Sequence, residues 1–596
     1  MSVLDRIERL RNVMEQQKID CYIIPTDDYH HSEYVGDYFK FREYITGFTG
    51  SAGTAVFTKD KAGLWTDGRY FIQAEAQLQG SGITLYKSGE PGVPTIEEFL
   101  KSELKEGDVL GFDGRTVTYA QGKRYCHIAD ENGASLKYSL DFAQNIWKER
   151  PEMSMESVFS LEDEYTGEKI GSKLERIREV MKENGCNAHV LSSLDDIAWL
   201  LNIRGNDIAY CPLVLSYAIV YNNSVELFAD IRKFSDDIIN LLAENQVKIY
   251  PYEDIYHKVS EMTSEDKLLL DSSIMNYSLY QAISKETVIV DKQNPEILMK
   301  SVKNETQAEN LRKAHLKDAV AHTKFMYWLK KNIGRVEITE LSASARLEGL
   351  RAEQEHFLGP SFGPISAYGE HGAIVHYSAD EKSNVPLKEG KLFMTDTGGH
   401  YLEGSTDITR TVALGEVGNI EKEHFTLVAR AMLRLANTVF LYRCSGANLD
   451  CISREVFWKE GLNFNHGTGH GVGYLLNIHE GPINFRWKEG ERPAPALEEN
   501  MVITDEPGIY IEGSHGIRLE NELLVRKTVK NEYGQFMNFE ILTYVPIDLD
   551  AILPEKMSTE EKEMLNHYHK QVYEKVSPYL SEEERIWLKE YTRAVK

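Results

Sequence analysis

The chain has 596 residues, enough for about three or four domains of ordinary size. Its 93 acidic residues outnumber its 67 basic ones and give a formal net charge of −26. A surface of this sign repels phosphate backbones and acidic membranes, so the composition argues against a nucleic-acid partner and against a membrane partner.

The N-terminal segment is charged and amphipathic, and it lacks the basic region followed by an apolar run that marks a secretory signal. The longest apolar stretch, around residues 211–221, is far shorter than the ~20 residues that a membrane-spanning helix needs. The sequence therefore predicts a soluble, cytoplasmic protein.

An internal repeat opens the chain. Residues 7–28 align without gaps on residues 174–195, and in each copy an amphipathic helical pattern leads into a short apolar strand. Farther on, residues 54–70 have a looser counterpart in residues 217–233. The repeat predicts two α/β modules of the same type.

The predicted bounds of these modules are residues 1–155 and 156–300. The stretch 148–169 between the repeats is polar and lacks clear periodicity, so it is predicted to be a linker. The second boundary is indicated by Asn294-Pro295, a turn signal.

A third domain, residues 301–545, is predicted to begin with a long helix. Asn304 and Gln307 have the spacing of a capping box, and apolar residues follow on one face at helical spacing. This face comprises Ala308, Leu311, His315, Ala319, Met326 and Leu329. Glycine-punctuated strands and further helices follow.

A C-terminal extension, residues 546–596, is predicted to form two helices. Each begins with a Ser-x-x-Glu box, at Ser558 with Glu561 and at Ser581 with Glu584.

Two aspartates lie in the stretch MTDTGGHYLEGSTDITRTV, residues 394–412. Aspartate is a poor strand former, yet Asp396 and Asp407 are both followed by β-branched residues. A hairpin with its turn near 401–402 would place them directly opposite each other, where two like charges are destabilising unless a cation lies between them. Because aspartates more often cap helices or lie in exposed turns, these two alone leave both interpretations open.

Further candidate ligands follow downstream. Residues 463–482 carry His466, His470 and His479 among glycines, which favours a strand or loop over a helix. Glu506 and Glu520 lie on either side of a turn predicted around 513–516. Each of these residues alone is more often structural, but five acids and imidazoles together indicate a metal site.

Four carboxylates and one imidazole balance the charge of two divalent cations and leave room for a bridging hydroxide. Such an oxygen-rich ligand set suits Mn²⁺, with Zn, Co or Fe as alternatives. Two such ions acidify a shared water and polarise a carbonyl, which is the chemistry of amide hydrolysis.

The order of these motifs resembles that of the pita-bread metallopeptidases: the two aspartates, then HGTGHGVG, DEPGIY and IRLEN. With its two N-terminal modules the whole chain is similar to the three-domain aminopeptidase P (Xaa-Pro aminopeptidase) family. The resemblance implies an α/β (α+β) fold, with two creatinase-type N-terminal α/β modules followed by a pita-bread catalytic domain.

The resemblance also implies roles for particular residues. Asp396 would hold one metal ion, His470 and Glu506 the other, and Asp407 and Glu520 both. Glu506 would also be the general base. The substrate-facing histidines would be His376, in GAIVHY, and His479, in NIHEGP, with His466 as a supporting hydrogen bonder. Arg69, in LWTDGRYF, would contact the peptide, although an ion pair with Asp67 is an alternative.

The implied activity is release of the N-terminal residue from peptides with proline at the second position, by attack of a metal-bridging hydroxide. A homodimer is implied as well. Three alternatives share the fold: prolidase, methionine aminopeptidase and a non-catalytic scaffold. The duplicated N-terminal module argues against the first two, and the full set of five ligands argues against the third.

Overall fold

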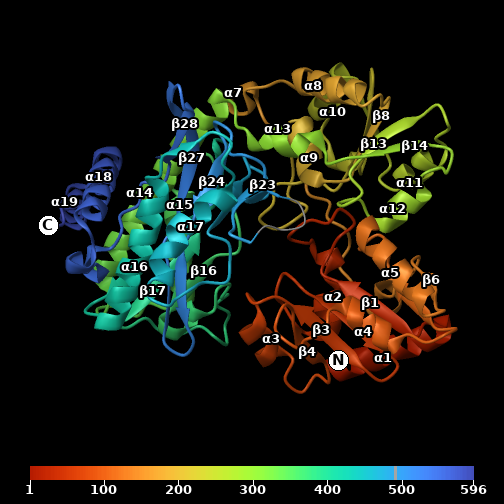
Figure 1. Ribbon diagram of the computed structural model, residues 1–596, viewed down its shortest axis with the longest axis horizontal. Helices are drawn as coiled ribbons and strands as arrows, with labels where there is room; N and C mark the ends of the chain where they lie inside the picture. Colours follow the sequence, from red (N-terminus) through yellow and green to blue (C-terminus); the bar gives the residue numbers. More distant parts are fainter. Residues whose placement is uncertain (489–492) are drawn as a thin grey trace. The chain divides into compact units, whose positions relative to one another are not determined.

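The computed structural model describes residues 1–488 and 493–596 (Figure 1). The chain divides into two compact units. The first comprises residues 1–161 and 168–297, and the second comprises residues 162–167 and 298–596. No helix in the described part of the chain is long and apolar enough to cross a membrane.

The first unit contains two six-stranded sheets, one for each sequence repeat. The first sheet has the order β4-β3-β2-β1-β5-β6. Its strands are β1 (Cys21–Pro25), β2 (Thr54–Thr58), β3 (Ala62–Thr66), β4 (Thr84–Lys87), β5 (Val109–Phe112) and β6 (Ser135–Lys137). The helix α1 (Val3–Gln17) precedes β1 and buries Ile7, Leu10 and Met14.

The second sheet has the order β12-β11-β10-β8-β13-β14 and repeats the first strand for strand. Its strands are β8 (Ala188–Leu191), β10 (Tyr217–Tyr221), β11 (Val225–Phe228), β12 (Val247–Tyr250), β13 (Lys267–Leu270) and β14 (Val288–Asp291), and α8 (Ile170–Glu183) precedes them. In each sheet the strand that comes first in the sequence, β1 or β8, pairs antiparallel with one neighbour and parallel with the other. The internal repeat predicted from the sequence is confirmed.

The stretch predicted as a linker is partly regular. It contains β7 (Phe159–Ser160), which pairs with β9 (Ile203–Arg204), and the short helix α7 (Asp163–Thr166), which belongs to the second unit. The division into two units does not separate the repeats from each other, so the four domain bounds stay predictions.

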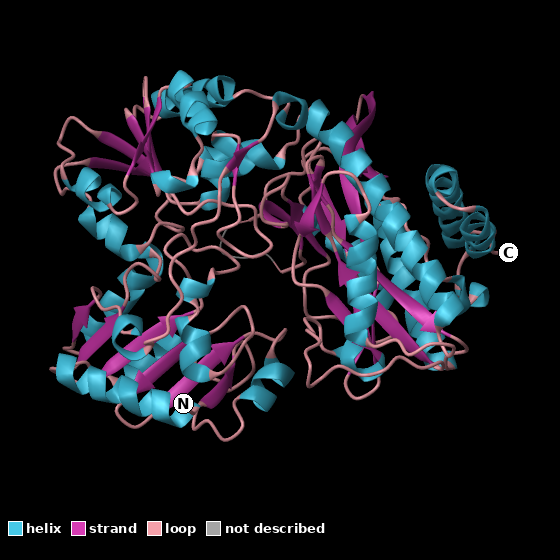
Figure 2. Cartoon of the chain, turned by 180° about the vertical axis from the view of Figure 1, so that it is seen from behind, coloured by secondary structure: helices cyan, strands magenta, loops and turns pink. Residues whose placement is uncertain are grey.

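The boundary between the units falls within α13 (Pro295–Ser301), and the 28-residue helix α14 (Glu305–Asn332) follows in the second unit. The predicted capping box is present, because the Asn304 side chain accepts from the Gln307 N–H and the Gln307 side chain accepts from the Asn304 N–H. All six residues of the predicted apolar face are buried. Figure 2 shows the helices of this unit lying alongside its strands. Before the C-terminal extension, this unit also contains α15 (Glu340–Ala352), α16 (Asn419–Ala436) and α17 (Gly446–Trp458).

The strands of the second unit form several small sheets and one larger one. The larger sheet has the order β21-β28-β27-β24-β22-β23, and the smaller ones are β16-β17-β20, β15-β18-β19 and β25-β26. Their bounds are β15 (Phe357–Pro360), β16 (Ile365–Tyr368), β17 (Lys391–Thr397), β18 (Gly399–Tyr401), β19 (Gly404–Ser405), β20 (Ile408–Leu414), β21 (Phe440–Leu441), β22 (Gly469–Val472), β23 (His479–Phe485), β24 (Val502–Asp505), β25 (Gly508–Ile511), β26 (His515–Arg518), β27 (Asn521–Asn531) and β28 (Gly534–Ile541).

One apolar core joins the helices of this unit to its strands. It includes Phe325 and Met326 of α14, Phe393 of β17 and Val412 of β20. The C-terminal helices α18 (Thr559–Val576) and α19 (Glu582–Tyr591) pack on the same core through Leu565, Val572 and Leu588, among others. Both begin with the predicted Ser-x-x-Glu capping boxes.

Arg410, in the middle of β20, is fully buried and links three parts of the unit. Its guanidinium donates to the carbonyls of Glu520 at 2.6 Å and Val545 at 2.9 Å. It also donates to the side-chain oxygen of Asn521 and, at 2.7 Å, to the hydroxyl of Tyr568 on α18. Arg410 thereby ties β20 to the start of β27 and to the C-terminal helix.

The variant Arg410→Met should lower the free energy of unfolding by more than about 3 kcal/mol, because several buried acceptors lose their donor at about 1–3 kcal/mol each. Urea denaturation followed by circular dichroism measures the loss. The control is Arg593→Met, which removes an exposed pair with Glu590 at 3.2 Å and should change stability by less than about 1 kcal/mol. Equal losses in the two variants would contradict this role of Arg410.

Candidate metal centre

The five predicted metal ligands lie where strands of the second unit begin or end. Asp396 is the next-to-last residue of β17, and Asp407 directly precedes β20. His470 lies within β22, so the predicted strand or loop around it is confirmed as a strand. Glu506 directly follows β24, and Glu520 directly precedes β27.

The predicted direct opposition of the two aspartates is wrong. The ladder between β17 and β20 pairs Asp396 with Thr409, not with Asp407. The turn lies between Tyr401 and Gly404, one residue farther along the chain than predicted, and this shifts the register by two residues. Because Asp407 and Thr409 are two apart on an extended chain, their side chains share a face, and the aspartates become diagonal neighbours.

The predicted hairpin geometry of the two glutamates is confirmed. The ladder of β25 with β26 pairs Gly508 with Arg518, and that of β24 with β27 pairs Asp505 with Asn521. The two ladders share one register. Continued across the gap between the ladders, this register places Glu506 opposite Glu520.

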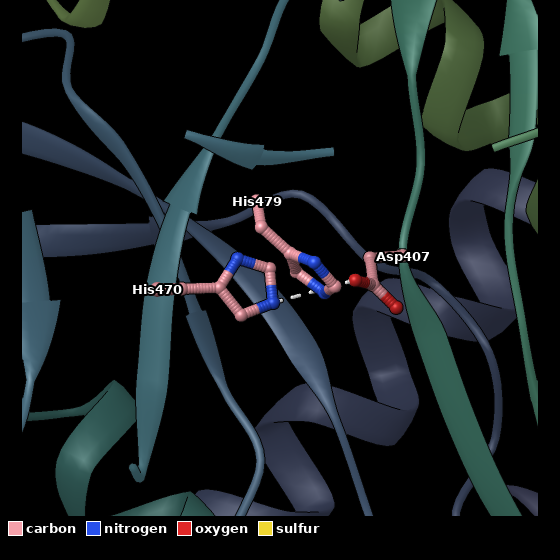
Figure 3. A group of neighbouring side chains, drawn as sticks. All are labelled: Asp407, His470 and His479. Atoms are coloured by element: carbon pink, nitrogen blue, oxygen red, sulfur yellow. Dashed lines mark ion pairs between the residues drawn. The ribbon is translucent and has the colours of Figure 1, made fainter. Parts of the chain in front are cut away.

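All five predicted ligands converge in one cluster. The ligand atoms within each of three overlapping groups lie within 4.8 Å of one another. The groups are Asp396, Asp407 and Glu520; His470, Glu506 and Glu520; and Asp407, His470 and His479. In the described part of the chain, no other His, Cys, Asp and Glu side chains form such a group. Figure 3 shows Asp407, His470 and His479 converging from three separate segments.

Hydrogen bonds orient the candidate ligands. The Nδ1 of His470 lies 2.9 Å from the carbonyl of Gly471, which directs Nε2 toward Asp407 at 3.5 Å and Glu506 at 3.6 Å. The hydroxyl of Thr409 donates to Glu520 at 2.7 Å, and that of Thr504 donates to Glu506 at 3.2 Å. Partners of this kind fix the orientation of metal-binding side chains.

The charges of the cluster leave a need for cations. Burial and then the neighbouring acids Asp407, Glu506 and Asp396 raise the pKa of Glu520 well above its usual range. Burial also raises the pKa of Glu506 and of Asp396. One buried oxygen of Asp396, Oδ1, has no hydrogen-bond partner. The carboxylates repel one another, and one of their oxygens lacks a hydrogen-bond donor. Both features fit the binding of hard or borderline divalent cations, which prefer oxygen ligands.

A cationic side chain that the sequence prediction missed also lies in the cluster. Arg518 donates to Asp396 through Nη2 and, at 3.1 Å, through Nε, and its Nη1 donates to the hydroxyl of Tyr510 at 2.7 Å. Arg518 is two residues before Glu520, and side chains two apart on an extended chain face the same way. This spacing could have predicted that Arg518 lies at the site.

His466 and His376 lie on loops beside this network. Nε2 of His466 lies 2.8 Å from the Tyr510 hydroxyl, and burial together with the charge of Arg518 lowers the pKa of His466 to about 3. His376 follows the short helix η3 (Gly369–Ala373), and Arg518 contacts the preceding carbonyl, that of Val375, at 3.4 Å. His376 is close enough for its charge to contribute to the lowered pKa of His466.

The predicted role of Arg69 stays a prediction. Arg69 lies in the first unit, where its Nε and Nη2 each donate to Asp67 at 2.8 Å. This is the ion pair that the sequence analysis gave as the alternative. The side chain is about one-third exposed and remains accessible.

Matches to known families cover nearly the whole chain. Residues 6–137 and 149–307 each match the creatinase/prolidase N-terminal domain. Residues 309–527 match metallopeptidase family M24, and residues 535–595 match the C-terminal region of that family. Fold and candidate site together define the class as an M24 metallopeptidase with duplicated creatinase-type domains.

Relatives of similar length refine this class. Xaa-Pro aminopeptidase 1 of Dictyostelium discoideum is 36% identical over 97% of this chain and 94% of its own length. Aminopeptidase P1 of Arabidopsis thaliana is 34% identical over 99% of both chains. The chain therefore belongs to the Xaa-Pro aminopeptidase family.

Solved structures agree with this. The crystal structure of an X-prolyl aminopeptidase from Caenorhabditis elegans, described as a cytosolic enzyme with a di-nuclear active site, superposes with a TM-score of 0.95. It is 33% identical to this chain, and the match covers 100% of both chains. An Xaa-Pro dipeptidase from Bacillus anthracis, 24% identical over 64% of this chain, shares the fold with a TM-score of 0.51.

Binding of Mn²⁺ to the metal-free protein should release protons near neutral pH. Burial disfavours the charged imidazole of His470, but the Asp407 and Glu506 carboxylates outweigh it and raise its pKa to about 9, so its Nε2 must lose a proton before it can bind metal. The apparent affinity should therefore rise with pH up to about 9. Calorimetric titrations in two buffers of different ionisation enthalpy measure the released protons, and equal heats in both buffers would contradict the prediction.

Proposed function

We propose that this chain is a metal-dependent aminopeptidase that releases the N-terminal residue from peptides with proline at the second position. The observation that carries the proposal is the convergence of Asp396, Asp407, His470, Glu506 and Glu520 in a chain related over its full length to Xaa-Pro aminopeptidases. A scaffold protein has no need for such a cluster, because crowded carboxylates without cations are unfavourable.

The two metal-binding groups of the proposal follow from the cluster. Asp396 would bind one cation, His470 and Glu506 would bind the other, and Asp407 and Glu520 would bind both. Asp396 and Glu506 fall in two different groups of neighbouring ligand atoms that share Glu520, which supports this division. We assign Mn²⁺ as the metal, because oxygen ligands dominate the set, with Zn, Co and Fe as alternatives. Two bound divalent cations supply a nucleophile at neutral pH and polarise the scissile carbonyl.

The remaining polar residues would bind substrate and move protons. His479 lies edge-on to His470, with ring centroids 4.4 Å apart. It would donate a hydrogen bond to a peptide carbonyl. His376 would take a similar role from the loop after η3. Glu506 would accept a proton as the general base. His466, whose low pKa keeps it neutral, would support Tyr510 rather than transfer protons.

Proline at the second position creates the need for a dedicated enzyme. The Xaa-Pro bond is a tertiary amide without an N–H, and the ring fixes φ. A site that is complementary in shape to the proline ring can bind such a peptide without a hydrogen bond from the missing N–H. The acidic cluster would also attract the free amino terminus of the substrate, which suits an exopeptidase. Arg69 would contact the peptide.

The proposed cell compartment follows a relative, whereas the proposed assembly follows the family resemblance of the sequence. We propose a cytoplasmic enzyme, in line with the cytosolic enzyme from Caenorhabditis elegans. We also propose a homodimer, for which light scattering should give twice the chain mass of 68.1 kDa.

The variant Asp407→Asn should lose more than about 100-fold in kcat/KM on a peptide that begins Arg-Pro-Pro, since even residues that only support metal ligands contribute 10–100-fold. Release of free arginine measures the rate. The matched control is Asp237→Asn, which removes an exposed aspartate on α10 (Asp236–Glu244) and should leave the rate unchanged. A folded Asp407→Asn variant with wild-type turnover would refute the proposal.

Peptide length separates this activity from that of a prolidase. We expect Arg-Pro-Pro peptides to be cleaved with a higher kcat/KM than the dipeptide Arg-Pro, because the proposed enzyme acts on longer chains. Parallel assays on the two substrates, with Mn²⁺ added, measure the ratio. Cleavage confined to the dipeptide would establish a prolidase instead.

A further inference from the structure

Asp407 sits at a break in the strand ladder. β19 ends at Ser405 and β20 begins at Ile408, so the N–H of Asp407 lies outside the backbone pairing on both sides. This N–H donates instead to a side chain, Oε1 of Glu522, at 2.6 Å. Asp407 and Glu522 are both buried, so no solvent can replace this acceptor.

Glu522 has one further contact through its main chain and one through its side chain. Its N–H donates to the hydroxyl of Thr543 at 2.9 Å, and its Oε2 lies 3.0 Å from Nε2 of His315 on α14. His315 and Glu522 are fully buried. One oxygen of the Glu522 side chain therefore faces the imidazole, and the other faces the Asp407 main chain.

Stability alone does not explain a fifth carboxylate beside this acidic cluster. Replacing a buried ion pair with apolar side chains is often neutral or stabilising, so such a pair is weak evidence for stability. An apolar residue at position 522 would, however, leave the Asp407 N–H without an acceptor. A carboxylate supplies a charge-assisted hydrogen bond, which is shorter and stronger than a neutral one.

We propose that Glu522 is a positioning residue of the metal centre, which fixes the main chain of Asp407 and thereby the carboxylate that connects the candidate ligand groups. His315 holds Glu522 in place. The inference rests on the proposed metal site and concerns how tightly that site binds its cations.

The test is the affinity of the metal-stripped protein for Mn²⁺, measured by calorimetry without substrate. Glu522→Asp keeps the charge that faces His315 but retracts the oxygen from the Asp407 N–H. Glu522→Gln keeps the reach and the acceptor but removes the charge. We expect Glu522→Asp to weaken Mn²⁺ binding about 10–100-fold, as loss of a supporting partner does, and Glu522→Gln to weaken it less.

Asp548 provides a matched control, because its carboxylate contacts both β20 and α14. Its carboxylate is buried, accepts the N–H of Ala413 in β20 at 2.8 Å and pairs with Lys330 of α14 at 2.6 Å, at the end of β20 away from Asp407. Asp548→Asn should lower the midpoint of thermal unfolding but leave the affinity for Mn²⁺ within about twofold of the wild type, because it breaks a buried pair that does not touch the cluster.

The outcomes separate the two proposals. Wild-type affinity in Glu522→Asp, a larger loss in Glu522→Gln than in Glu522→Asp, or an equal loss in Asp548→Asn would each overturn the positioning role and leave the proposed function intact. A wild-type protein that binds no divalent cation would overturn both. Both substitutions at position 522 change the side chain by one group, and thermal unfolding of each metal-free variant verifies its fold.

Discussion

Repulsion among carboxylates gathered in a largely buried cluster is the constraint on which this structure depends. Asp396, Asp407, Glu506 and Glu520 raise one another's electrostatic energy, and Arg518 offsets the charge of only one of them directly. A chain that folds with such a cluster must hold it together by other means. The candidate metal ions and the surrounding hydrogen bonds serve that purpose together.

The scaffold meets this demand with strands rather than loops. Each candidate ligand lies within a strand or next to the end of one, and neighbouring hydroxyls and carbonyls orient its side chain. Ladders on rigid sheets hold side chains more accurately than loops do. Asp407, Glu506 and Glu520 all lie in short gaps between successive strands. At these gaps the carboxylates leave the regular pleat and meet.

Local signals predicted a large share of the fold. The repeat at residues 7–28 and 174–195 anticipated two sheets of the same strand order, because each copy carries its own helix-to-strand pattern. The capping residues Asn304, Ser558 and Ser581 marked the starts of three helices, since a cap acts over only a few residues. The five ligand candidates came from residue types, spacing and family resemblance, and the structure places them together.

What sequence did not reveal depends on distant pairings or on turn geometry. The register of Asp396 with Thr409 follows from a turn displaced by one residue, a small difference that no propensity resolves. The contacts of Arg518 with Asp396 and of His315 with Glu522 join segments more than a hundred residues apart. Nothing in the local pattern around His315 distinguishes it from an ordinary residue on a buried helix face.

The bond from Arg410 to Tyr568 gives the C-terminal tail an unexpected relation to the candidate site. The same guanidinium that bonds to α18 also bonds to the carbonyl of Glu520, so α18 and a candidate metal-binding segment share one anchor. Shortened forms of the chain that end before α18 would lose more than peripheral surface. Engineers seeking a smaller enzyme would do better to trim elsewhere.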